Sequence, residues 1–406
     1  MKSAVVVVID RLGAGFLGPY GNTWLDTPQF NRLASQSLLF ETALADSPEL
    51  ALAYRAWWNS QHAVEPKTSS RLALAQLARE AGLHAILFTD ERSVAEQPNA
   101  VPFAARTGQW IESPGHAAPD LTETETGKFF LAAIEEINAL RESSLVWLHC
   151  RGMAGPWDAP LALRQQFADE DDPEPPEFIE PPEMLLPGNF DPDELLGILH
   201  AYAGQVALVD ACLGSLLDTL DDSPLADQTL LAVTSPRGYP LGEHRRIGGD
   251  DLYGELLHVP LLLRLPGGRG GPARSQRLVQ PCDLYATLAE WLELPTDDAP
   301  GIGQSLLPVA DGEPVPLRQM AVATASGQRA IRTPAWLLRE TQASGQTRRE
   351  LFAKPDDRWE VNEISSRCGD IAEQLAAAAD QFQQAAASGT FASLPPLAEI
   401  LIDSRR

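Results

Sequence analysis

An unbroken apolar run occupies residues 4–9 and ends at Asp10. Mostly β-branched residues without polar alternation are typical of a strand buried on both faces of a parallel sheet. In open α/β sheets the ligand site lies beyond the carboxyl ends of such strands, which is the position of Asp10. The carboxylate therefore either handles a metal or phosphate group or merely caps the following turn, and the pattern leaves both roles open.

Apolar stripes at helical spacing alternate with short apolar runs along most of the chain. This alternation is typical of a doubly wound α/β sheet. We predict one large α/β domain over residues 1–314 and a small α+β subdomain over 315–406. The predicted helices span 28–34, 70–82, 125–141, 194–220 and 370–387, with a loop-to-helix element over 47–58. The predicted strands span 4–9, 38–40, 84–88, 145–148, 229–233, 259–263, 320–324 and 335–339.

The alternation of predicted helices and strands is interrupted at residues 168–194, because the first ten of these residues are acidic and proline-rich. Such a composition predicts a long exposed loop rather than a packed element. Charge runs of this kind are usually only solvated, yet loops of such length in compact domains are often functional. The acidic loop 168–194 is therefore a candidate surface for a protein partner.

The chain of 406 residues carries a formal net charge of −25. Repulsion of phosphates argues against nucleic acid or an anionic membrane as a partner. We identify no apolar run long enough to span a bilayer, and the early first strand leaves no room for a signal peptide, so a cytoplasmic protein is expected. The cysteines are far apart, which indicates neither a zinc site nor a disulfide framework; they are Cys150, Cys212, Cys282 and Cys368.

Several sequence blocks follow one another in a distinctive order along nearly the whole chain. They include Gly-Pro-Tyr-Gly at 18–21, Leu-Gly-Glu-His at 241–244 and Glu-Leu-Phe at 350–352, and further blocks lie at 27–34, 203–217, 259–261, 283–288 and 301–308. This order resembles the sulfatase family of the alkaline phosphatase superfamily. The resemblance implies a mixed, mostly parallel sheet between helices, with a small C-terminal α+β subdomain.

The family's nucleophile has no counterpart in this chain. Sulfatases hydrolyse sulfate esters with a formylglycine made from the first residue of a Cys/Ser-x-Pro-x-Arg motif, beside a calcium ion held by oxygen ligands. The motif aligns with residues 51–55, which places Ala51 at the modified position and retains Arg55. Alanine has no atom to oxidise or to attack with. Arg55 is either a structural residue or a remaining anion contact.

The metal ligands are also replaced. Asp10 matches the first metal carboxylate, but Arg11 stands where the second is expected, and Pro236-Arg237 replaces the late Asp-His/Asn pair. Calcium needs six or more oxygen ligands, so one remaining carboxylate beside arginines is not expected to hold it. An ion pair of Asp10 with Arg11 or Arg237 would fill the vacated metal position with a fixed cation.

Other pocket positions differ from the family as well. Asp90 and Arg92 align with a lysine and a histidine, Ala154 aligns with the pocket histidine, and His62 stands where Arg or Lys is usual. No lysine lies between Lys128 and Lys354, so the late active-site lysine has no candidate. The implied cleft is vestigial, with no calcium and no formylglycine; its members are Asp10, Arg11, Ala51, Arg55, Asp90, Arg237 and His244.

Two functional hypotheses follow from the resemblance. The first is a pseudoenzyme without sulfuric ester hydrolase activity that acts as a binding or scaffold protein, and its arginine-rich cleft could bind an anion without cleaving it. The second is a hydrolase of sulfate or phosphate esters with a remodelled site that uses His62, His149 or His244 as a general base. Bound divalent ions and turnover of an aryl ester would distinguish the hydrolase from the scaffold.

Overall fold

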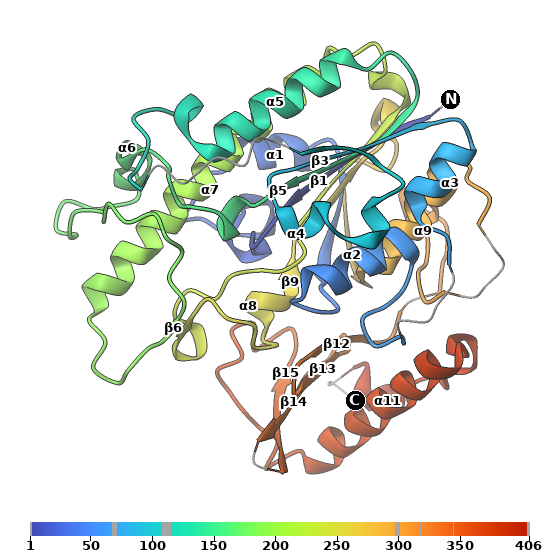
Figure 1. Ribbon diagram of the computed structural model, residues 1–406. Coiled ribbons are helices and arrows are strands. Elements are labelled where there is room, and N and C mark those ends of the chain that lie inside the picture. The colour runs from blue at the N-terminus through green and yellow to red at the C-terminus, as the bar shows by residue number, and fades with distance from the viewer. Residues whose placement is uncertain are drawn as a thin grey trace.

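The computed structural model describes residues 2–66, 71–107, 115–296, 301–316, 318–343 and 345–403. Its largest feature is a nine-stranded mixed sheet, whose main path runs in the order β11-β2-β10-β7-β1-β5-β3-β4 (Figure 1). The strands are β1 (Ser3–Ile9), β2 (Leu38–Leu44), β3 (His84–Thr89), β4 (Ala104–Thr107), β5 (Ser144–Cys150), β7 (Thr229–Thr234), β9 (His258–Val259), β10 (Leu261–Arg264) and β11 (Ala273–Val279).

Most neighbouring strands of this sheet are parallel. Strand β1 pairs in parallel with β5 and β7, β3 pairs in parallel with β5 and β4, and β11 pairs in parallel with β2. Among the strands of the described residues, only the pairs made by β10 and β9 in this sheet are antiparallel. Every residue of β1 is buried. The predicted doubly wound α/β sheet and its two-sided first strand are therefore confirmed.

Helices cover both faces of the sheet. One face buries Val6 and Val8 against α2 (Leu50–Asn59), α3 (Leu74–Glu80) and α9 (Pro281–Trp291). The opposite face buries Val5, Val7 and Ile9, and its covering helices are α1 (Pro28–Ala34), α5 (Glu125–Ala139) and α7 (Pro192–Asp221) (Figure 1). The remaining α-helices are α4 (Arg92–Ala95), α6 (Leu161–Gln165), α8 (Gly254–Leu257), α10 (Leu307–Ala310) and α11 (Gly369–Ser388).

The C-terminal part forms a small antiparallel sheet with α11 on one face (Figure 1). Its strands are β12 (Ala321–Ala325), β13 (Gln328–Arg332), β14 (Trp336–Ala343) and β15 (Gln346–Ala353). Leu338 and Leu351 pack towards α11, whereas Leu337 and Phe352 belong to the core of the large domain. The small sheet therefore lies between α11 and the large domain. The boundary placed at residue 314 stays a prediction.

The sequence predicted one strand over 259–263, but the structure has two. The backbone of Pro260 separates β9 from β10, because proline lacks the N–H that a central strand must donate. Strand β9 pairs with β2, and β10 lies between β2 and β7. The break lets one segment pair at two places along the same edge of β2.

Helix α7 is the exception to the prediction that no apolar run could span a bilayer. By length and composition this 30-residue helix could cross a membrane, and 72% of its most apolar window is buried inside the protein. Burial of this kind is typical of a core helix, and α7 packs against the sheet, α5 and α6.

The acidic loop 168–194 is irregular over most of its length, as predicted, but it is not simply exposed. Arg164, which is fully buried, donates hydrogen bonds to the carbonyls of Trp157, Pro176 and Phe178. The short strand β6 (Met184–Leu185) pairs with β8 (Arg246–Ile247). A buried cation thus fixes the backbone of the loop while carboxylates such as Glu177 stay exposed.

Replacing Arg164 by methionine is expected to lower the free energy of unfolding by about 3 kcal/mol or more, because it leaves buried carbonyls without a donor. Urea unfolding measures this loss, and limited proteolysis is expected to cut within residues 168–180. Arg141→Met is the matched control, because exposed Arg141 also donates to two carbonyls. Equal stability of the two variants would contradict the anchoring role of Arg164.

Candidate functional site

The carboxyl ends of four parallel neighbours, β3, β5, β1 and β7, meet at one edge of the large sheet. Asp90 follows β3, Asp10 follows β1, and Arg237 lies three residues beyond β7. The N-terminus of α2 joins them, because Arg237 Nη1 donates to the carbonyl of Pro48 at 2.8 Å. The topology therefore brings Asp10, Asp90 and Arg237, with the first turn of α2, to one rim.

Asp10 and Arg237 form a two-pronged ion pair at this rim. Arg237 Nε donates to Asp10 Oδ1 at 3.0 Å, and Nη2 donates to Oδ2 at 3.0 Å. The Asp10 carboxylate is 2% exposed and the Arg237 side chain 15% exposed, so the pair is largely shielded from water. The guanidinium thus satisfies both oxygens of the carboxylate that the family resemblance assigns to calcium.

The electrostatics of the pair favour its charged form. Burial by itself would raise the pKa of Asp10, but the charge and hydrogen bonds of Arg237 outweigh it, and the pKa lies below its ordinary value. The pKa of Arg237 is raised, because the attraction of Asp10 outweighs the effect of burial. Both groups are therefore ionised across the physiological pH range.

Close backbone packing fixes the loop that carries Arg237. Gly238 N donates to the carbonyl of Leu256 at 2.7 Å. A Cβ on Gly238 would lie 2.0 Å from the carbonyl oxygen of Glu255, so only glycine fits there. The fixed backbone at Gly238 therefore helps to hold the Arg237 guanidinium in place, together with the hydrogen bonds to Asp10.

Arg11 turns away from Asp10. Its backbone has a φ of +60°, in the left-handed region that non-glycine residues rarely adopt. Its guanidinium donates to the carbonyl of Gly249 at 2.9 Å and to Asp250 Oδ1 at 3.1 Å. Arg237, rather than Arg11, is therefore the arginine that fills the position beside Asp10.

Ala51 and Arg55 have different surroundings although they share α2. Ala51 is exposed on the first turn of the helix, near the carbonyl of Pro48 that Arg237 contacts. Arg55 is buried, and its Nη2 donates to the carbonyls of His62, Ala63 and Glu65. Arg55 thus holds the segment after α2, which is the structural one of its two expected roles.

Asp90 and His149 complete the rim beside Asp10. Asp90 Oδ1 accepts a hydrogen bond from the backbone N–H of Arg151 at 2.8 Å, and burial raises the pKa of Asp90 to about 7. His149 is fully buried in β5, with Nδ1 2.6 Å from the hydroxyl of Tyr54. Burial lowers the pKa of His149 to about 4. His149 is therefore neutral, buried and in contact with Tyr54, so a substrate cannot reach its ring.

His62 lies away from the rim. Its ring is fully buried, packs edge-on against Phe382 of α11 and stands 3.9 Å from Asp46. Burial lowers the pKa of His62 to about 3, so the ring is neutral. The residue is part of the contact between the large domain and α11.

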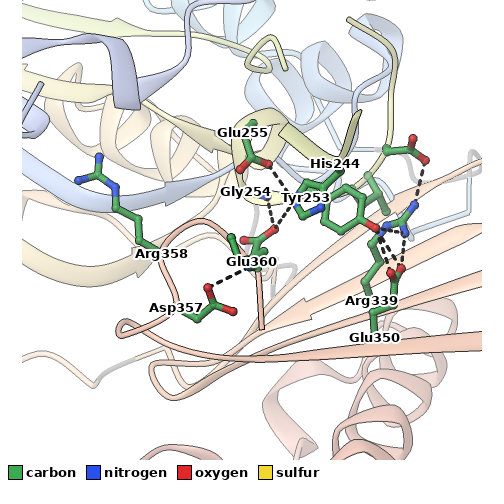
Figure 2. A network of polar contacts seen from close by, with 12 residues as sticks. His244, Tyr253, Gly254, Glu255, Arg339, Glu350, Asp357, Arg358 and Glu360 are labelled. Atoms are coloured by element: carbon green, nitrogen blue, oxygen red, sulfur yellow. Dashed lines mark hydrogen bonds and ion pairs between the residues drawn. The ribbon is translucent and has the colours of Figure 1, made fainter. Parts of the chain in front are cut away.

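His244 belongs to a second polar cluster (Figure 2). Its ring stacks on Tyr253 with centroids 3.6 Å apart, and its Nε2 lies 3.7 Å from Glu255 Oε2 and 4.0 Å from Glu360 Oε2. Glu255 and Glu360 also line a cavity of about 690 Å³ between the large domain and the C-terminal part. Glu360 follows His244 by more than a hundred residues, and no motif in the sequence points to either glutamate.

The comparisons with known proteins agree with this architecture. The family described as Sulfatase matches residues 2–294. The chain therefore belongs to the sulfatase family, within the alkaline phosphatase superfamily.

Individual relatives match shorter stretches. The multifunctional alkaline phosphatase superfamily protein PehA of Trinickia caryophylli is 32% identical over 127 residues, which cover 31% of this chain and 24% of that protein. Iduronate 2-sulfatase of Homo sapiens is 32% identical over 97 residues, which cover 24% of this chain and 18% of that protein. These alignments thus span a quarter or less of the relatives' length.

Solved structures match the whole chain in fold. The phosphonate monoester hydrolase of Agrobacterium radiobacter superposes with a TM-score of 0.77 at 18% identity and covers 98% of both chains. The phosphonate monoester hydrolase SpPMH of Silicibacter pomeroyi gives a TM-score of 0.72 at 16% identity and covers 95% of both chains. At this identity the likeness shows the fold alone, which is the predicted alkaline-phosphatase-like α/β architecture.

Proposed function

We propose that this sulfatase-family protein is a pseudoenzyme that binds or scaffolds a partner and does not hydrolyse sulfate esters. The observation that supports it best is the ion pair between Asp10 and Arg237. A guanidinium beside Asp10 repels a divalent cation and uses both carboxylate oxygens that such an ion would need. Without the metal, the rim lacks the charge that polarises a sulfate ester.

The missing nucleophile supports the same proposal. The first turn of α2 presents the exposed methyl group of Ala51, which cannot form a covalent intermediate. The histidines considered as alternative bases are poorly placed at this rim, because His62 and His149 are fully buried. His244 is partly exposed, but it belongs to the separate cluster with Glu255 and Glu360.

An anion at the rim would compete with existing contacts. Arg237 already donates to Asp10 and Pro48, and Arg11 already donates to Gly249 and Asp250. We therefore propose the acidic loop 168–194, rather than the rim, as the principal binding surface. Arg164 fixes the backbone of this loop. The exposed carboxylates of the loop are therefore presented to a basic partner in a defined arrangement.

Neither wild type nor Ala51→Cys is expected to turn over a chromogenic aryl sulfate, with or without added calcium. One missing oxyanion-stabilising donor typically costs on the order of 10²–10³ in rate, and groups that act as a unit fail together. The assay should include a chromogenic phosphonate monoester, because phosphonate monoester hydrolases share the fold. Asp10→Asn and His244→Gln serve as controls for residual activity.

Steady turnover by the wild type that is abolished in Asp10→Asn would overturn the proposal and restore the rim as an active site. Turnover lost only in His244→Gln would instead favour a hydrolase remodelled around the second cluster.

A further inference from the structure

Three side chains from distant parts of the chain converge beside the 690 Å³ cavity: His244, Glu255 and Glu360. Figure 2 shows His244 and Glu255 coming from the large domain and Glu360 coming from the C-terminal part. One ligand atom of each residue lies within 4.8 Å of the other two. The cluster therefore joins the two parts of the protein around a common point.

The donors of this cluster are buried but incompletely satisfied. The Glu255 side chain is 8% exposed, and its Oε2 has no hydrogen-bond partner among the described residues. Within the described part of the chain, Nε2 of His244 also has no hydrogen-bond partner. Figure 2 shows both groups pointing towards each other, although 3.7 Å is too long for a hydrogen bond. Leaving such groups without a partner is costly, so the arrangement points to a missing ligand.

We propose that His244, Glu255 and Glu360 form a binding site for one divalent transition-metal ion of the zinc or manganese class. An imidazole nitrogen with two carboxylate oxygens is a donor set that suits these ions, whereas calcium prefers oxygen ligands alone. Ligand atoms around zinc lie roughly 3.3 Å apart, given metal–ligand distances of about 2.0–2.1 Å. The His244–Glu255 and His244–Glu360 separations of 3.7 and 4.0 Å would therefore have to close by roughly 0.4 and 0.7 Å when an ion binds.

Neighbouring groups orient the ligands as outer groups commonly do in metal sites. Lys354 Nζ donates to Oε1 of Glu360 at 2.8 Å, and the N–H of Gly254 donates to Oε2 at 2.9 Å. Unlike Asp10, whose two oxygens both pair with a guanidinium, Glu360 meets the cation with Oε1 alone, and Oε2 keeps a lone pair for an ion. Tyr253 fixes the plane of the His244 ring by stacking. Glu255 and Glu360 line the cavity, so an ion held by them would be accessible to water or a small ligand.

Equilibrium dialysis of the full chain against Zn²⁺, after removal of metal with a chelator, tests the site directly. We expect one Zn²⁺ per chain, and we expect Glu255→Gln and His244→Gln each to weaken its binding by roughly tenfold or more. Glu41→Gln is the matched control, because Glu41 lines the same cavity outside the cluster, and it should bind Zn²⁺ like the wild type. Circular dichroism confirms that each variant is folded.

A wild type that shows no saturable Zn²⁺ binding would overturn the proposal, and this arm does not depend on how the variants fold. Folded Glu255→Gln and His244→Gln proteins with wild-type affinity would overturn it equally. A Co²⁺ complex of the wild type offers an independent signature, because its visible absorption is expected to change in His244→Gln. None of these readouts involves ester turnover, so the metal site can fail or hold independently of the pseudoenzyme proposal.

Discussion

Replacing Arg237 by methionine is expected to destabilise the folded protein by about 3–5 kcal/mol at neutral pH, because it leaves the Asp10 carboxylate charged, buried and unpaired. Asp10 is 2% exposed and receives two hydrogen bonds from this guanidinium. Removing the charge of Asp10 as well as that of Arg237 should restore much of the loss, because no unpaired buried charge then remains. Urea unfolding of Arg237→Met and of the double variant Asp10→Asn/Arg237→Met measures both effects.

The pair also predicts a pH dependence. Because the folded pKa of Asp10 lies below its ordinary value, its contribution to stability is present above the unfolded pKa and is lost as pH falls through the folded pKa. As the pH is lowered from about 5, the free energy of unfolding of Arg237→Met should therefore fall less than that of the wild type. An Arg237→Met protein as stable as the wild type at neutral pH would show that the ion pair contributes little.

Arg339→Met is expected to cost a similar amount, about 3–5 kcal/mol, and to loosen the contact between the C-terminal sheet and the large domain. Figure 2 shows this guanidinium beside both Glu350 of β15 and Tyr253. Arg339 Nη1 donates to Glu350 Oε2 at 2.6 Å, and Nη2 donates to Asp251 Oδ1 at 2.8 Å. Its removal leaves Glu350 buried with one of its two arginine partners gone.

Arg348→Met provides the matched control for Arg339. Arg348 donates to the same carboxylate, Glu350 Oε1, at 2.8 Å, but its side chain is 71% exposed. A surface pair of this kind is worth about 0–1 kcal/mol, so this variant should unfold nearly like the wild type. Equal losses in the two variants, measured by urea unfolding, would contradict the assignment of the interface to buried Arg339.

The sequence predicted the large sheet well where burial alone determines the pattern. The sequence of strand β1 is continuously apolar because both of its faces are covered, and the long apolar stripe of α7 predicts a helix. Strands β4 and β11 of the large sheet had no counterpart in the prediction. Strands β13 and β15 of the small sheet were also missed, because half or more of their residues are exposed or only partly buried and many are charged. Their hydrogen bonds come from hairpin partners, which a local hydrophobic pattern does not reveal.

The candidate site was predictable only in part. The family resemblance predicted an ion pair of Asp10 with Arg11 or Arg237, and the structure has the pair with Arg237, 227 positions away. It did not decide between the two roles of Arg55, whose guanidinium donates to backbone carbonyls, and it gave no signal for the approach of Glu360 to His244. Such contacts depend on how the C-terminal sheet docks on the large domain, which residue identity alone does not specify.

A crystal structure grown with excess calcium, viewed at Asp10, tests the central claim most directly. We expect the Arg237 guanidinium to remain about 3 Å from both Asp10 oxygens, with no cation beside them, as charge-assisted pairs of this geometry require. A calcium ion coordinated by Asp10, with Arg237 turned away from the rim, would contradict the proposal that a fixed arginine has replaced the metal.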